Sequence, residues 1–233
     1  LYACRLLVQS LMVLEIIVYV QWTVLELFLR RLRDSNVSSL IVGPPLSENP
    51  TLLDTLQIRG ISFGGIGLPL ETYDVPFIKM DEELAAEEMT DYLFDLGHKR
   101  IALIKGPEDH KESDLRYRGS QTSLSNRNVP SQKELIRAGD FTYVSGIKCA
   151  AELLSMDNPP DAIFACNDDM AAGAIAAVHR AGLRVPEDVT IVGFDDTENA
   201  SATWPTLTTI QQPIRAMARQ AIEMLTSADN GMI

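Results

Sequence analysis

The sequence predicts an α/β protein with parallel sheets flanked by helices, and three observations predict it. Short apolar runs alternate with helical stretches of about ten to fifteen residues, which is the pattern of βαβ units. Polar residues follow two of these runs directly, Asn167 after Ala162–Cys166 and Asp195 after Val189–Phe194. The chain has 233 residues, enough for two modules of this kind.

The elements can be assigned in order from Leu40. A strand over Leu40–Val42 is followed by a helix over Asn49–Arg59, in which Pro50 is tolerated because it falls in the first turn. Ile61–Phe63 is expected to form the next strand. The glycines that follow predict a loop over Gly64–Gly67.

The next helix has clear signals at both ends. Asp81 is a suitable N-cap for a helix over Glu82–Leu96, whose acidic first turn suits the helix dipole, and Gly97 is suited to end it. A strand follows at Ile101–Ile104. Further helices are expected at Gly119–Asn126, Val144–Ser155, Asp169–Ala181 and Ile214–Leu225, and further strands at Ala162–Cys166, Val189–Phe194 and Leu207–Ile210.

The stretch Leu11–Leu29 is almost wholly apolar and long enough to suggest a membrane span. Glu15, Gln21 and Glu26 interrupt it, however, and each carboxylate at mid-bilayer would cost about 3 kcal/mol. We therefore expect a buried helix or strand rather than a membrane contact, in a chain whose natural start precedes Leu1.

Composition narrows the classes of function. Lys and Arg total 20 against 32 Asp and Glu, giving a net charge of −12 that repels phosphate backbones. This polypeptide alone is therefore not expected to bind nucleic acid. Its three cysteines form no CxxC pattern and are expected to be apolar core residues in a reducing compartment, which favours the cytoplasm.

Common catalytic and cofactor motifs are missing from the sequence. Gly64–Gly67 lacks the G-x-G-x-x-G spacing of dinucleotide sites, and neither a P-loop nor a G-x-S-x-G elbow occurs. The three histidines lack metal-ligand spacing. The acidic pairs Asp168-Asp169 and Asp195-Asp196 could serve acid/base chemistry, but at strand ends such residues more often form a hydrogen-bonding platform. We expect no enzyme activity, cofactor or metal.

A series of motifs in a fixed order covers about residues 40 to 225. The motifs are Leu96–Ala102, Gly106-Pro107, Arg116–Gly119, Gly139–Thr142, Asp161–Met170, Gly182–Val189, Val192–Asp196 and Pro205–Ile210. This series resembles the effector-binding core of the LacI/GalR family of bacterial transcription regulators. Ser120 departs from the family pattern, in which Phe usually follows the glycine of the Arg116 motif, and residues 1–32 follow the pattern poorly.

The resemblance implies a fold like that of periplasmic sugar-binding proteins, with two Rossmann-like subdomains. Residues 1–80 with 210–233 would form the N-terminal subdomain and residues 81–209 the C-terminal one, with a ligand cleft between them. A small effector, a sugar or sugar derivative, would allosterically control a repressor's binding to operator DNA. The DNA contact would be made by a helix-turn-helix headpiece that this sequence does not contain, and the protein would be a homodimer.

By position, the resemblance assigns four ligand-binding residues: Arg116, Phe141, Asn167 and Asp195. Arg116 offers a planar fork of donors, Asp195 accepts from hydroxyls, and Asn167 both donates and accepts. Phe141 offers a flat apolar face for a sugar ring.

Each of these residues also has a purely structural interpretation. Arg116 could pair with Asp114 on the surface, Phe141 could be a core aromatic, Asn167 could be a helix N-cap, and Asp195 could cap the segment after its strand.

Two further alternatives stay open. The small residues of Asp169–Ala181 could form the dimer interface, as in the family, or pack within the chain itself. A transport-type sugar-binding protein of the same fold is the alternative function, and a sugar-processing enzyme would need a nucleophile or base pair that the sequence does not show.

Overall fold

The computed structural model describes residues 39–44, 46–67, 73–108 and 110–230, together with Leu32 and Val37. The chain divides into two compact units. The smaller unit holds the described residues up to Met80 and those from Pro213 onward, and the larger unit is Asp81–Gln212. The sequence-based boundary between residues 209 and 210 falls inside a strand of the larger unit, which continues to Gln211. The apolar stretch Leu11–Leu29 lies outside the described residues.

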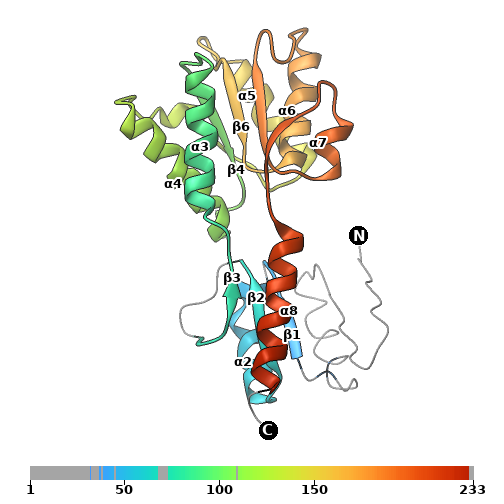
Figure 1. Ribbon diagram of the computed structural model, residues 1–233. Helices are drawn as coiled ribbons and strands as arrows, with labels where there is room; N and C mark the ends of the chain where they lie inside the picture. The colour runs from blue at the N-terminus through green and yellow to red at the C-terminus, as the bar shows by residue number, and fades with distance from the viewer. Residues whose placement is uncertain are drawn as a thin grey trace. The chain divides into compact units, whose positions relative to one another are not determined.

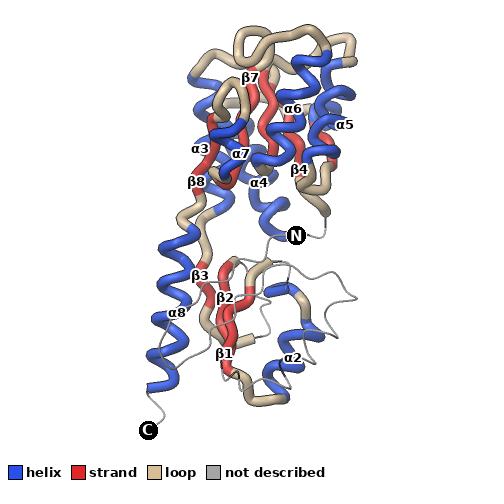
Figure 2. The backbone as a smooth tube through the Cα atoms, turned by 90° about the vertical axis from the view of Figure 1, so that its right-hand side faces the viewer, coloured by secondary structure: helices blue, strands red, loops and turns tan. Residues whose placement is uncertain are grey.

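The smaller unit is built on a three-stranded parallel sheet with the order β1-β2-β3. Its elements are β1 (Ser39–Val42), the 3-10 turn η1 (Leu46–Glu48), α2 (Pro50–Ile58), β2 (Ser62–Ile66), β3 (Phe77–Ile78) and α8 (Ile214–Asn230). Helices α2 and α8 lie on opposite sides of these strands (Figure 2). Asn49 caps α2 by accepting a hydrogen bond from the Leu52 amide at 3.1 Å, and Leu52, Leu53 and Leu56 are fully buried. They belong to a core that also holds Leu40, Val42 and Phe63.

The predicted loop at Gly64–Gly67 is wrong, because Gly64, Gly65 and Ile66 belong to β2. A side chain at Gly65 would place its Cβ 2.4 Å from both the Phe77 ring and the Val42 carbonyl oxygen. Glycine is therefore needed here so that the neighbouring chain segments can approach β2 closely. The glycines mark close packing within a strand rather than a turn.

The larger unit is built on a five-stranded parallel sheet with the order β5-β4-β6-β7-β8. The strands are β4 (Ile101–Lys105), β5 (Ile136–Ala138), β6 (Ala162–Ala165), β7 (Thr190–Asp195) and β8 (Thr208–Gln211). Strand β6 is buried at every position, as expected of a central strand covered on both faces. The predicted fold class, parallel sheets flanked by helices, is confirmed.

Helices cover this sheet on both sides, α3 and α4 on one and α5 and α6 on the other (Figure 1). The helices are α3 (Glu82–Asp95), α4 (Lys111–Asn126), the 3-10 turn η2 (Lys133–Leu135), α5 (Tyr143–Leu154), α6 (Asp168–Arg180) and α7 (Glu198–Ala202). Asp81 caps α3 as predicted, accepting from the Leu84 amide at 3.0 Å. Helix α4 begins at Lys111, earlier than the predicted Gly119, and therefore includes Arg116.

Helices α5 and α6 approach each other through glycines. A Cβ added at Gly146 would lie 2.2 Å from the Met170 carbonyl oxygen, and one added at Gly173 would lie 2.2 Å from that of Tyr143. Ala171, Gly173 and Ala174 are buried. Part of the small-residue surface of α6 is therefore used for packing within the chain, as one of the two interpretations predicted.

Within the described part of the chain, the helices are either too short or too polar to cross a lipid bilayer.

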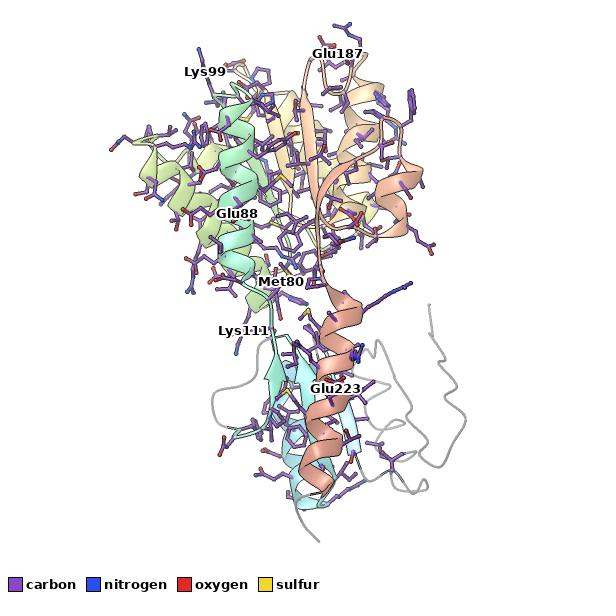
Figure 3. All side chains as sticks on the ribbon, in the orientation of Figure 1. Met80, Glu88, Lys99, Lys111, Glu187 and Glu223 are labelled. Atoms are coloured by element: carbon purple, nitrogen blue, oxygen red, sulfur yellow. The ribbon has the colours of Figure 1, made fainter. Side chains whose placement is uncertain are left out.

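The order of the larger sheet reverses at β4, since the next strand along the chain, β5, lies on one side of it and β6 lies on the other. In open α/β sheets, ligands bind beyond the carboxyl ends of the strands at such a point. Lys99 and Glu187 precede β4 and β7 and mark the amino ends of the strands, at the top of Figure 3. Lys111, which begins α4, lies at the opposite, carboxyl end (Figure 3).

Candidate ligand-binding site

Arg116 lies beneath the carboxyl edge of the larger sheet and is only 5% exposed. Its Nε donates a hydrogen bond to Glu82 Oε2 at 2.7 Å, and its Nη1 donates to the Cys166 carbonyl oxygen. Nη1 also lies 3.7 Å from Asp195 Oδ1. The guanidinium therefore joins α3, the end of β6 and the end of β7.

The surface interpretation of Arg116 is wrong, because Asp114 pairs with Arg118 instead, at 2.6 Å. The Arg116 guanidinium carbon lies 3.7 Å from the centre of the Phe194 ring, so the cation also stacks on an aromatic face. Burial alone would lower the pKa of Arg116, but attraction by Glu82 and Asp195 outweighs burial and raises it. The cluster holds a permanent buried cation.

Asp195 is the last residue of β7 and the most accessible charged member of this cluster, with a side chain 27% exposed. Its Oδ1 accepts a hydrogen bond from Gln212 Nε2 at 2.6 Å. It does not cap the segment after its strand, since the N-cap of α7 is Thr197. Burial raises the pKa of Asp195 to about 6, against the attraction of Arg116 and the hydrogen bond from Gln212, which lower it.

Asn167 follows β6 and is the N-cap of α6, as one interpretation of the sequence predicted. Its Oδ1 accepts from the Met170 amide at 2.9 Å, and its Nδ2 donates to the Phe141 carbonyl oxygen at 3.0 Å. Asn167 thus fixes both the start of α6 and the turn that carries Phe141.

Phe141 lies over Gly106, at the end of β4. A Cβ added to Gly106 would fall 2.1 Å from the tip of the Phe141 ring, so glycine alone leaves room for it. The His110 ring meets the Phe141 ring edge-on, with 5.2 Å between centroids. Phe141 has a positive φ of 64° and is half-buried, so it is not the core aromatic of the alternative interpretation.

The structure places all four predicted residues around the carboxyl ends of β4, β6 and β7. Arg116 and Asp195 meet directly, whereas Asn167 is joined to Arg116 through the carbonyl of its neighbour Cys166. Phe141 is linked to the group through Asn167. That these residues contact a ligand stays a prediction.

Sequence reasoning missed two members of the cluster, Glu82 and Gln212. Glu82 is 6% exposed, yet its place in the first turn of α3 is explained equally well by the helix dipole. Its burial depends on how α4 packs on α3, and the local sequence carries no signal for this. Gln212 follows β8 and has no motif of its own in the sequence.

Chemically, the cluster presents the Asp195 carboxylate as a hydrogen-bond acceptor in a fixed position. Arg116 and Gln212 hold the Asp195 carboxylate from within, and its exposed part can accept hydrogen bonds from hydroxyl or N–H groups. The Phe141 ring beside it provides an apolar surface. Such an arrangement suits a small polar solute with one less polar face.

We predict that Asp195→Asn stabilises the ligand-free protein at neutral pH. The pKa of Asp195 is about 6 in the folded state and about 3.9 in the unfolded state. The folded state therefore binds this proton more tightly than the unfolded state does. The stability that the proton contributes is fully present below pH ~4 and is lost as pH rises to ~6. Asn imitates the protonated form, so the gain should reach at most about 3 kcal/mol above pH ~6 and vanish below pH ~4.

Urea unfolding of both proteins between pH 4 and 8 measures this difference. Asp196→Asn is the matched control, because it makes the same substitution at the exposed neighbouring residue. A difference between Asp195→Asn and wild type that stays constant with pH would contradict the assignment of the raised pKa to Asp195.

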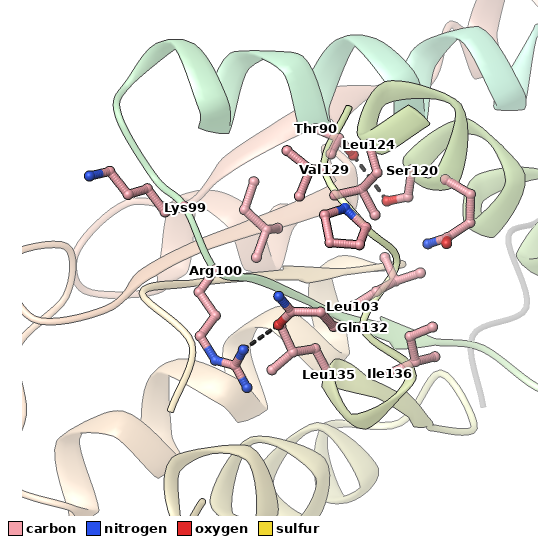
Figure 4. A pocket seen from close by; sticks show the side chains of 13 residues that line it. Thr90, Lys99, Arg100, Leu103, Ser120, Leu124, Val129, Gln132, Leu135 and Ile136 are labelled. Atoms are coloured by element: carbon pink, nitrogen blue, oxygen red, sulfur yellow. Dashed lines mark hydrogen bonds between the residues drawn. The ribbon is translucent and has the colours of Figure 1, made fainter. Parts of the chain in front are cut away.

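A cavity lies elsewhere in the larger unit, between α3, α4 and the segment before β5 (Figure 4). Its volume is about 20 Å³, room for one water, and none of the four predicted residues lines it. Thr90 Oγ1 and Ser120 Oγ lie 3.0 Å apart on its wall, drawn as a dashed line in Figure 4. The cavity thus lies where the small Ser120 replaces the Phe that is usual in the family pattern.

The sequence is similar to a known family of ligand-binding domains and to bacterial transcriptional regulators. The sequence profile of the periplasmic binding protein-like domain matches residues 90–231. The transcriptional repressor CytR of Escherichia coli K12 is 37% identical over 158 residues, which are 68% of this chain and 46% of that protein. The transcriptional regulator CelR of Thermobifida fusca is 33% identical over 182 residues, 78% of this chain and 53% of that protein. The chain therefore spans about half the length of these relatives.

Solved structures agree with the sequence relatives. A complex of the transcriptional regulator CelR with cellobiose superposes with a TM-score of 0.82 at 30% identity, covering 91% of this chain and 65% of that one. A regulatory protein of the LacI family from Chloroflexus aggregans superposes with a TM-score of 0.80 at 27% identity, covering 89% and 74%. The chain belongs to the family of periplasmic binding protein-like domains, and within it to the ligand-binding cores of LacI-type regulators.

Proposed function

We propose that this chain is the ligand-sensing core of a LacI-type transcriptional repressor. A small effector binds at the carboxyl edge of the larger sheet and is recognised by Arg116, Phe141, Asn167 and Asp195. The observation that carries this proposal is the buried cluster of Arg116, Glu82 and Asp195, in which Asp195 keeps an exposed portion. Family membership supports the same site, since the four residues lie at the positions that the family motifs indicate.

The effector is a sugar or sugar derivative in this proposal. The cellobiose complex of the related CelR supports that class. Asp195 can accept from two neighbouring hydroxyls, and the half-buried Phe141 can face the C–H side of a sugar ring. Purines also offer N–H donors and a flat face, so they belong in the same binding screen.

The wider role of the protein follows from its relatives. Repressors that recognise operator DNA need a basic surface, and the net charge of −12 makes this polypeptide unsuited to that contact. We propose that DNA is bound by a helix-turn-helix outside residues 1–233, that the protein works in the cytoplasm as a homodimer, and that it has no enzyme activity. Effector binding shifts the population between two arrangements of the core, by no more than the difference in its affinity for them.

That the ligand lies in a cleft between the two subdomains stays a prediction. A transport-type binding protein of the same fold stays the alternative function. The regulators among the relatives support the repressor over that alternative.

A thermal-shift screen tests the proposed site. The panel contains hexoses, disaccharides including cellobiose, uronic acids, sugar phosphates and purines. A compound at a hundredfold its Kd should stabilise the wild-type protein by about 2.7 kcal/mol. Asp195→Asn should lower that stabilisation to about 1.4 kcal/mol or less at the same ligand concentration, because its affinity falls at least about tenfold. Its ligand-free form should be at least as stable as wild type, and Asp196→Asn should preserve the full stabilisation.

Two results would contradict the proposal. One is stabilisation of wild type and Asp195→Asn to the same extent by the same compound. The other is conversion of a panel compound into product, which would favour an enzyme.

A further inference from the structure

Asp168 is a fully buried carboxylate next to the site, although the site proposed above does not use it. It is 0% exposed and is the first residue of α6. Its Oδ2 accepts hydrogen bonds from the Thr197 amide at 2.7 Å and from the Thr197 hydroxyl at 3.1 Å. Its Oδ1 accepts from the Thr209 hydroxyl at 2.6 Å. One side chain thus joins α6, the segment after β7 and strand β8.

The sheet leaves room for this carboxylate. A Cβ added at Gly193, within β7, would lie 2.5 Å from Asp168 Oδ1 and 2.7 Å from a Leu207 methyl carbon. Any larger residue at Gly193 would displace the Asp168 side chain. The glycine of the Val192–Asp196 motif is therefore explained by the carboxylate that packs over it.

The segment that Asp168 holds has an unfavourable backbone. Asp195 has φ of 112° and Asp196 has φ of 55°, two consecutive non-glycine residues in the left-handed region. Such conformations persist only where surrounding contacts hold them. The Thr197 amide, the first donor after this pair, donates to Asp168. Gln211, the last residue of β8, donates to the Asp196 carboxylate at 2.6 Å. Gln212, the next residue, donates to the Asp195 carboxylate at 2.6 Å.

We propose that Asp168 is a positioning residue that holds the strained Asp195–Thr197 turn in place, so that the Asp195 carboxylate faces Arg116 and the ligand. Its importance for binding rests on the proposed function, but its effect on the turn can be measured without any ligand. Burial raises the pKa of Asp168, against the hydrogen bonds from Thr209 and Thr197 that lower it. Those three bonds favour the charged form and are the means by which the carboxylate holds the turn.

Three substitutions separate positioning from general stability. Asp168→Ala removes all three acceptor contacts. Asp168→Asn keeps the geometry, because its oxygen can accept from Thr197 while its amide donates to the Thr209 hydroxyl. Val178→Ala, which makes a cavity at a fully buried position of the same helix, is the control for loss of stability alone.

The test uses the ligand-free protein and two readouts. In Asp168→Ala, the Thr197 amide should exchange hydrogen at least about tenfold faster than in Val178→Ala, because it loses a bond to a charged acceptor. Besides burial, the Asp168 charge itself raises the pKa of Asp195, so either substitution at Asp168 should lower that pKa. In Asp168→Ala the pKa of the Asp195 carboxyl, followed by NMR, should fall further than in Asp168→Asn, from about 6 toward about 4, as the turn opens to water. Asp168→Asn keeps an acceptor for the Thr197 amide, although a neutral one, so exchange at Thr197 should stay clearly slower than in Asp168→Ala.

The result that overturns the proposal is equal exchange at Thr197 in Asp168→Ala and Val178→Ala, together with the same pKa of Asp195 in Asp168→Ala and Asp168→Asn. If Asp168→Ala does not fold, Thr209→Val removes one of the three bonds and should still speed exchange at Thr197; wild-type exchange there would also overturn the proposal. Loss of ligand binding in Asp195→Asn is a separate result. It tests the proposed function and leaves the positioning role of Asp168 unaffected.

Discussion

Replacing Arg116 by methionine is expected to destabilise the protein by about 3–5 kcal/mol at pH 7. Methionine fills a similar space but leaves the Glu82 carboxylate without its hydrogen bond and Asp195 without a nearby cation. It also leaves the Cys166 carbonyl without its donor. Removing one partner of a buried ion pair costs more than the pair contributes, because the remaining charge is buried and unpaired.

The pH dependence of this loss identifies its cause. Without Arg116, the folded-state pKa values of Glu82 and Asp195 should rise further, so both carboxylates can be neutralised by protonation. The difference from wild type should therefore be largest above the raised pKa values of the variant and should shrink as pH falls toward ~6, the folded-state pKa of Asp195 in wild type.

Urea unfolding at several pH values measures this effect, and Arg118→Met is the matched control. Arg118 lies in the same helix with a 60% exposed side chain paired with Asp114, so its loss should change stability by about 0.5 kcal/mol or less. Equal losses in the two variants would show that Arg116 does not form a buried ion pair.

The second large effect is expected at Gly173, where α6 meets α5. A Cβ there would lie 2.2 Å from the Tyr143 carbonyl oxygen and 2.8 Å from the Ile147 amide nitrogen. Both are backbone atoms, so the helices must move apart rather than adjust a side chain. We expect Gly173→Ala to destabilise the protein by about 3 kcal/mol, at the upper end of the usual cost of overpacking.

Gly182→Ala isolates the contribution of backbone conformation. Gly182 follows α6 with φ of 75° and has no atom within 4 Å of an added Cβ. Its substitution should cost only about 1 kcal/mol, from the left-handed conformation. Thermal and urea unfolding of the two variants compare the two costs, and an equal loss in both would mean that helix packing at Gly173 is looser than the structure shows.

The elements that were predicted are those with strong local signals. Apolar runs identified β4, β6 and β7, and Asp81 and Asn167 marked the starts of α3 and α6. Because parallel strands end at the same edge of a sheet, the polar residues after β6 and β7 were expected to lie near each other.

Helix α4 shows why part of the site could not be predicted. The buried residues of α4 are Glu112, Ser113, Arg116, Gly119, Ser120 and Ser123. These residues recur at helical spacing, but none is a large hydrophobic residue, so a search for apolar periodicity does not find the helix. Gly119 allows the close approach, since its Cβ would lie 2.0 Å from the Glu83 carbonyl oxygen. The burial of Glu82 and Arg116 follows from this packing, which depends on residues far apart in the sequence.

Short elements were missed for a different reason. Strand β3 has two residues and β5 has three, too few for an alternating pattern to appear. The glycines of β2 resemble a turn in the sequence, because their close contacts with Phe77 and Pro76 arise only when the sheet has formed.

Calorimetric titration most directly tests whether Asp195 accepts hydrogen bonds from a bound solute. The panel compound that gives the largest thermal shift is titrated into wild type, Asp195→Asn and Asp196→Asn at pH 7.5, where the Asp195 carboxylate is ionised. Loss of a hydrogen bond to a charged group should weaken binding to Asp195→Asn at least about tenfold, while Asp196→Asn binds like wild type. Equal affinity for wild type and Asp195→Asn would place the ligand elsewhere and contradict the proposed site.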